Sequence, residues 1–198
     1  MGMFTVISED VFNELQVDAG VLLNSFNPAS PTTPTSQNII TATTGGITAS
    51  CTPTYEDFFA DVDNAPNNVM EGKRITGWDC KFSTTAIGTS PELIRLSLGA
   101  ADVTASSGKI APRRNLSLSD FDSSIWWVGD RSDGGLVAIE LKNALSTSGF
   151  SLKTTKNGKG QIALELTGHV SISAQDVVPM AFYSIEGTTG TTGTTGTT

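Results

Sequence analysis

Short segments of the chain alternate strictly between apolar and polar residues, which is the period of a β-strand with one buried face. The two clearest segments carry Ile47, Ala49 and Cys51, and then Trp78, Cys80 and Phe82. If they pair as an antiparallel hairpin with both apolar sets on one face, the numbers of facing residues must have an odd sum. Cys51 opposite Cys80 satisfies that condition. We therefore expect these two thiols to be reduced cross-strand neighbours on the core face.

Further strands are predicted over 125–128, 136–142 and 162–173, with a weaker last strand over 175–186. Phe150 and Leu152 share a face with the apolar residues that begin at Ile162 only if facing residues have an even sum. An even sum requires a loop of odd length, such as a three-residue turn, and excludes a two-residue turn at Asn157-Gly158. Residues 100–124 are predicted to be loop with short turns.

One short helix is predicted at about residues 90–99. Ser90 suits the N-cap, Pro91 the first helical position and Gly99 the position that follows the last turn. Most of the helix is apolar, so we expect it to cover one side of a sheet. Because longer helical patterns are almost absent and glycine and threonine are abundant, the chain is predicted to be mainly β with extended arms.

A long segment, Tyr55–Arg74, separates the two clearest strands and far exceeds the usual length of a hairpin loop. Its aromatic content argues against disorder, so we interpret it as a contact loop. Its apolar contact candidates are Tyr55, Phe58, Phe59 and Val62. Its acidic candidates are Glu56, Asp57, Asp61 and Asp63.

The first 38 residues are predicted to be an N-terminal arm followed by a linker rich in proline and threonine. The arm carries four apolar residues proposed for contact: Val21, Leu22, Leu23 and Phe26. They pack either on their own domain or on a neighbouring subunit, and the sequence leaves both possibilities open. Residues 39–186 are then the β-domain. Residues 187–198, a repeat of Gly-Thr-Thr, are predicted to be a mobile tail.

Charge is distributed unevenly along the chain, whose net charge is −8. Residues 1–72 contain nine acids and neither lysine nor arginine, and the first paired arginines are Arg113 and Arg114. Such a balance argues against a protein that grips nucleic acid through its phosphates. The acidic half is either an ordinary solvated surface or a surface that docks on a basic patch of another copy, for which Arg113 and Arg114 are the candidates.

No residue pattern indicates an enzyme, a cofactor site or a metal site. His169 is the only histidine, and two cysteines with one distant histidine do not complete a zinc site. No nucleotide-binding motif is present. Neither a signal peptide nor an apolar run of membrane-spanning length is recognised, so we expect no membrane association. Trp126-Trp127 could stack on a sugar, although adjacent strand residues face opposite sides and one of them should lie in the core.

Several segments resemble, in their order along the chain, the major tail tube proteins of long-tailed (siphovirus-type) bacteriophages of Gram-positive bacteria. The resemblance extends over residues 10–186. It is carried by Asp18-Ala19-Gly20-Val21-Leu22-Leu23, Thr52-Pro53-Thr54-Tyr55, Asp63-Asn64-Ala65-Pro66, Leu98-Gly99-Ala100-Ala101-Asp102, Trp126-Trp127-Val128-Gly129-Asp130, Asn143-Ala144-Leu145-Ser146-Thr147-Ser148-Gly149-Phe150, Gly158-Lys159-Gly160-Gln161 and Thr167-Gly168-His169.

The resemblance implies a β-sandwich or half-barrel of two packed sheets with one flanking helix, a long stacking loop, and N- and C-terminal arms. It implies six copies per ring, and stacked rings through which DNA passes without sequence-specific binding. Other expected partners are the tail tip or initiator, tape measure and tail terminator proteins. The protein would be assembled in the bacterial cytoplasm and reside in the virion tail. The alternative is a monomeric β-sandwich that binds carbohydrate on a virion or cell surface.

Overall fold

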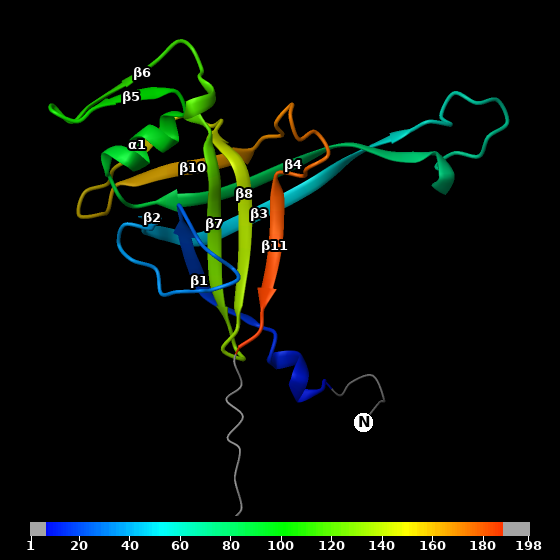
Figure 1. Cartoon of the computed structure of the whole chain (residues 1–198), viewed down its shortest axis with the longest axis horizontal. Helices are drawn as coiled ribbons and strands as arrows, with labels where there is room; N and C mark the ends of the chain where they lie inside the picture. Colours follow the sequence, from blue (N-terminus) through cyan, green and yellow to red (C-terminus); the bar gives the residue numbers. More distant parts are fainter. Residues whose placement is uncertain (1–6, 188–198) are drawn as a thin grey trace, which may run out of the picture.

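The computed structural model describes residues 7–187 and shows a mainly β chain with one short α-helix (Figure 1). Its described residues form a nine-stranded antiparallel sheet in the order β2-β1-β7-β8-β10-β4-β3, with β11 paired to β8 and β9 paired to β10, and a two-stranded sheet of β5 and β6. The predicted mainly β fold with a flanking helix is confirmed.

The elements, in chain order, are η1 (Glu9–Phe12), β1 (Gln16–Leu23), β2 (Ile39–Thr41), β3 (Thr43–Asp57), η2 (Met70–Gly72), β4 (Lys73–Ala86), α1 (Pro91–Leu98), β5 (Ala101–Thr104), β6 (Lys109–Pro112), η3 (Leu118–Asp120), β7 (Asp122–Arg131), β8 (Leu136–Ser146), β9 (Leu152–Lys153), β10 (Gln161–Gly168) and β11 (Met180–Ile185).

The large sheet divides at β8, which pairs with β7 on one side and with two different strands on the other. The first part of β8 pairs with β11, and Ala144 to Ser146 pair with β10. Asn143, at the division, has a left-handed backbone conformation with φ of 47°. Its side chain donates to the carbonyl of His169, and the His169 ring lies 3.2 Å from the carbonyl of Asn143. The only histidine therefore has a structural place where β10 and β11 separate.

Apolar side chains are buried on both faces of the sheet. The larger cluster joins β4, β8 and β10 to the helix, with Phe82, Leu93, Leu141 and Leu164 among its members. A smaller cluster lies on the other face, where Trp126 packs with Leu23, Val128 and Ala138. Phe26, from the segment that follows β1, covers this cluster with its ring centroid 5.6 Å from that of Trp126.

Helix α1 has the ends that the sequence predicts. The backbone N–H of Leu93 donates to the Ser90 hydroxyl, and Gly99 ends the helix with φ of 74°. Leu93 and Leu96 are buried against the main core. These two leucines, one turn apart, thus suffice to attach so short a helix to the sheet, as expected.

Strand β1 corrects the prediction that residues 1–38 form an arm and linker apart from the β-domain. β1 pairs with β7, where Leu22 faces Trp127, and also with β2. Leu22 is 0% exposed and Leu23 is 2% exposed. Since consecutive strand residues point to opposite faces and both faces are covered here, Leu22 and Leu23 enter the two clusters of this chain's own core.

Strands β3 and β4 form a much longer hairpin than the sequence predicts. Their register runs from Thr43 opposite Ala86 to Asp57 opposite Lys73, with irregularities after Thr44 and Thr54. Part of the predicted loop Tyr55–Arg74 is therefore strand, and the connection is limited to 58–72. Cys51 faces Cys80 as predicted, and their sulfur atoms lie 2.7 Å apart with both cysteines free.

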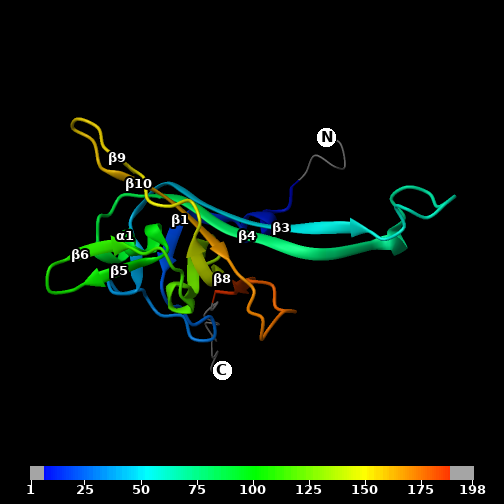
Figure 2. The ribbon, with the colours of Figure 1, turned by 90° about the horizontal axis from the view of Figure 1, so that it is seen from above.

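The remaining strand predictions are partly correct. Leu152 faces Ile162, an even sum, but the connecting loop covers 154–160 and Leu152 is half exposed at the projecting end of the hairpin (Figure 2). Strand β10 ends at Gly168 rather than near residue 173, and 100–124 contains the unpredicted hairpin β5–β6. The predicted tail lies outside the described residues beyond Gly187.

Candidate functional site

The β3–β4 hairpin extends well away from the rest of the molecule and forms the most prominent surface feature (Figures 1 and 2). From here on, "the arm" means residues 52–79 of this hairpin and not the predicted N-terminal arm. Cys51 and Cys80 face each other at its base, and Cys80 is the last buried side chain of β4 before the strands leave the body. Within the arm, Gly72 is the one residue that is buried. The arm therefore has two surfaces and no core of its own.

Large apolar side chains are exposed along the arm. The exposed set comprises Tyr55 (60%), Phe58 (53%), Phe59 (40%), Val62 (53%), Met70 (81%), Ile75 (44%) and Trp78 (38%), the last of which the sequence had placed on the core face. Four of them are the apolar contact residues predicted for this segment. The sequence did not single out Met70 or Ile75, although Ile75 directly faces Tyr55 across the two strands. A clustering of this kind exceeds the scattered exposure that is normal for single apolar residues.

The far end of the arm is held in shape by specific contacts. The Phe58 N–H donates to the carbonyl of Gly72, and the Phe59 N–H donates to the Asp57 carboxylate. The Arg74 guanidinium lies 4.4 Å from the centroid of the Phe58 ring, a cation–π contact. A Cβ atom at Gly72 would lie 2.8 Å from the Phe59 ring, so glycine is needed for this close approach.

The four predicted acidic residues also lie on the arm, but they differ in their partners. Asp57 accepts the Phe59 N–H and pairs with Lys73 at 3.3 Å. These contacts, the backbone hydrogen bond first, hold the pKa of Asp57 below its usual value. Glu56 faces Arg74 in the strand register, whereas Asp61 and Asp63 are exposed in the connecting loop. Three of the four side chains are thus open to a partner, and Asp57 orders the end of the arm.

A second exposed apolar surface lies at the N-terminal end of the described chain. Ile7, Val11, Phe12 and Leu15 are each about half exposed or more. This segment contacts the body through Ser132, whose N–H donates to the carbonyl of Leu15 and whose hydroxyl donates to the carbonyl of Phe12. Of the predicted contact residues, Leu22 and Leu23 are buried in the core of their own chain, which excludes them from contact with a neighbour. Val21 and Phe26 pack against the smaller cluster but stay partly exposed, so for them contact with a neighbour stays a prediction. The exposed residues precede them.

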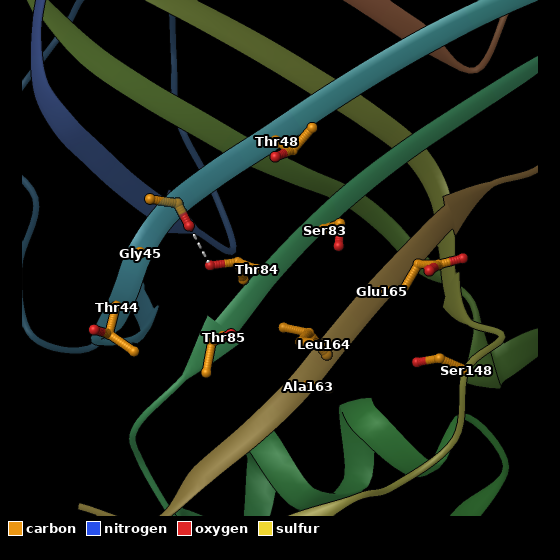
Figure 3. Close-up of a pocket in the computed structure, with 11 residues that line it drawn as sticks. Thr44, Gly45, Thr48, Ser83, Thr84, Thr85, Ser148, Ala163, Leu164 and Glu165 are labelled. Atoms are coloured by element: carbon orange, nitrogen blue, oxygen red, sulfur yellow. Dashed lines mark hydrogen bonds between the residues drawn. The ribbon is translucent and has the colours of Figure 1, made fainter.

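The surface of β3, β4 and β10 that faces away from the core is a hollow lined mainly by hydroxyl groups (Figure 3). Thr48, Ser83 and Thr85 lie on it with Ala163 and Glu165, and its volume is about 330 Å³. Glu165 is the one charged residue of this lining, and Lys81 lies 3.9 Å from its carboxylate. The surface offers neither an aromatic platform nor a group of converging acids.

The predicted basic patch is reduced by internal pairing. Arg113 contacts the carboxylates of Asp102, at 2.9 Å, and Asp120. The Asp120 side chain is 5% exposed and also accepts the Ser117 N–H. Arg113 is consequently engaged in holding the hairpin β5–β6 against η3. Arg114 is exposed and remains a candidate for contact.

The tryptophan pair, considered above as a sugar-binding platform, has structural contacts within its own chain. Trp126 is 5% exposed, while Trp127 packs against the main cluster and its indole N–H donates to the carbonyl of Ala19. Over residues 7–187, no three histidine, cysteine, aspartate or glutamate side chains gather closely enough to hold a metal ion. The same part of the chain contains no helix that is long and apolar enough to cross a membrane.

Comparison of the sequence with models of known protein families and with curated proteins finds no match in either.

Proposed function

We propose that this chain is a structural, non-catalytic subunit that assembles with copies of itself into stacked rings, as the tube of a long-tailed phage does. The observation that carries the proposal is the arm, which presents a row of large apolar side chains that its own chain leaves uncovered. The order of segments that resembles major tail tube proteins supports the same role.

The arm makes physical sense as part of an assembly. An isolated two-stranded hairpin is at best marginally stable in water, because two strands cannot bury their side chains on each other. Here the hairpin exposes Tyr55 and Ile75 from its strands and Phe58 from its connection to solvent in the single chain. A neighbouring subunit that covers these residues would stabilise the arm and gain binding energy from the same buried area.

Unpaired strand edges favour ring formation by copies of this chain. β2 and β3 end the path of paired strands in the large sheet, so each has one edge with free backbone groups. Such edges pair readily with another chain. In a closed ring of identical copies, the free strand edge of each copy can pair with a free strand edge of the next copy. Six copies per ring is the number that the resemblance implies.

The hydroxyl-lined face of β3, β4 and β10 is the surface that we assign to the channel (Figure 3). Hydroxyl groups keep such a surface hydrated, and Lys81 is already close to Asp79 and Glu165. DNA phosphates would find few free cations to bind there, which suits passage without sequence-specific binding. The acids of the arm, Glu56, Asp61 and Asp63, would then serve contacts between rings.

In this role the chain is assembled in the bacterial cytoplasm and works in the virion tail. Its partners would be other copies of itself, the tail tip or initiator, the tape measure and the terminator proteins, with DNA in the channel. The carbohydrate-binding alternative is less well supported, because Trp126 and Trp127 pack within their own chain instead of forming an open aromatic platform.

Negative-stain electron microscopy and light scattering of the purified chain over a range of concentrations test the proposal. Hollow rings or tubes of uniform diameter are the expected result. A strict monomer at every concentration, even with tail initiator complexes added, would overturn it. Glycan binding by that monomer would favour the alternative.

A further inference from the structure

We propose that Cys51 and Cys80 form a site of reversible covalent modification, a cross-strand disulfide made by exchange with a small-molecule disulfide such as oxidised glutathione. The site lies at the base of the arm, where the buried Cys80 faces the partly buried Cys51 just before the strands become solvent-exposed. The proposal stands apart from the assembly function, since it depends on the geometry of one chain.

The backbone already places the two residues where a disulfide needs them. Cys51 and Cys80 face each other directly in the β3–β4 register, and their sulfur atoms lie 2.7 Å apart. Directly opposed residues of antiparallel strands have Cα atoms roughly 4.5–5.5 Å apart. A disulfide spans Cα separations of about 4.4–6.8 Å, so the bond can form without movement of the strands.

The environments of the two thiols determine the order of reaction. Cys80 is 0% exposed, whereas Cys51 is only partly buried. Burial, with a further contribution from the hydrogen bond to Cys51, raises the pKa of the Cys80 thiol to about 12. The thiolate is the reactive form, so Cys51 is the first nucleophile and Cys80 resolves the intermediate.

The reaction balances as two exchanges. The Cys51 thiolate attacks one sulfur of oxidised glutathione, forms a mixed disulfide and releases one glutathione thiolate. The Cys80 thiol then gives up its proton and attacks the Cys51 sulfur, which expels the second glutathione. In total the two protein thiols lose two electrons and two protons, and one glutathione disulfide is reduced to two glutathione thiols.

The cross-link would fix the register of the arm at its base. It closes a loop over residues 52–79, which contains the whole arm, and the entropy that it removes from the unfolded chain corresponds to a rise in melting temperature of roughly 10 °C. Disulfides are rare in a reducing cytoplasm and persist outside it. In the role proposed above, the chain would meet both conditions in that order, although the cross-link itself does not depend on that role.

The test is incubation of the full chain with a series of reduced and oxidised glutathione mixtures, followed by alkylation of free thiols and peptide mapping by mass spectrometry. We expect loss of both free thiols, a peptide that links residues 51 and 80 within one chain, and a melting temperature that rises on oxidation and returns with reductant. The Cys51→Ser variant should keep an unreacted Cys80, because that thiol is buried.

Three results would overturn the proposal: two free thiols in fully oxidised glutathione, a glutathione adduct that remains on Cys51, or a disulfide between chains. The Cys80→Ala variant provides the complementary control, in which Cys51 should retain glutathione because no second thiol can displace it. If that buried substitution prevents folding, the Cys51→Ser variant and the wild-type peptide map decide the question.

Discussion

Replacing Phe58 with serine is expected to weaken the stacking of rings much more than the folding of the chain. The Phe58 side chain is 53% exposed. About 100 Å² of an aromatic side chain of roughly 200 Å² is then available to a neighbouring subunit. At about 25 cal/mol per Å², covering this area contributes up to about 2.5 kcal/mol to each contact, close to a hundredfold in the association constant.

The cost to folding should be local. The covered side of the Phe58 ring lies against Arg74 near the end of the arm. Within residues 52–79 the structure has one buried residue, a glycine, so loss of this contact loosens the end of the arm without opening the core. We expect the melting temperature to change by no more than about 4 °C, the effect of about 1 kcal/mol in a domain of this size.

The assay is sedimentation velocity together with electron microscopy over a concentration series. Phe58→Ser should need roughly a hundredfold higher concentration than the wild type to form tubes. Leu118→Ser is the matched control, because Leu118 is 91% exposed on η3, away from the arm. The reasoning would be refuted if Phe58→Ser formed tubes at wild-type concentrations while its melting temperature fell by much more than expected.

Three further outcomes are expected. Leu22→Ala, at a 0% exposed site, should lower the free energy of unfolding by about 2–5 kcal/mol in urea titrations, and an unchanged midpoint would contradict its place in the core. Arg113→Ala should lower the free energy of unfolding by about 1–3 kcal/mol in the same assay, because it leaves the buried Asp120 carboxylate without its arginine. The control Arg114→Ala should change the free energy of unfolding by less than about 0.5 kcal/mol. Because the folded-state pKa of Asp57 is lowered, its contribution to order at the end of the arm is present above the unfolded pKa and is lost as pH falls through the folded pKa. Amide protection factors, corrected for the intrinsic exchange rate at each pH, should therefore fall in the arm before they fall in the core, and a simultaneous fall would oppose this.

Some features of the fold follow from residues that are close in sequence. The ends of helix α1 depend on Ser90 and Gly99, which act on backbone groups within one turn of themselves. The opposition of Cys51 and Cys80 was expected because alternation assigns each thiol to the core face and this pairing is among the odd-sum registers that such alternation allows; the structure shows that register. Predictions of this kind succeed because the deciding interaction is local, as at the helix ends, or because the alternation of side chains along a strand limits the possible registers.

The length of the arm could not be predicted in the same way. Residues 55–57 and 73–75 do not alternate as a strand with one buried face, since both faces of the arm are open to solvent. They are strand because each pairs with a partner across the hairpin, as Asp57 does with Lys73. Pairing, and not burial, extends these strands, so hydrophobic periodicity indicated a loop.

The sequence by itself determined that this chain is mainly β, where its helix begins and ends, that Cys51 and Cys80 can share the core face and which side chains of the Tyr55–Arg74 segment are apolar. Tertiary structure alone decided which candidates remain available to a partner. An apolar run such as Leu22 and Leu23 gains the same free energy from covering by its own sheet or by another subunit, and a cation such as Arg113 is equally suited to Asp120 or to a partner's acid. Only the positions of segments distant in the sequence distinguish those outcomes, because hydrophobic and charge–charge attractions depend on what lies nearby in space.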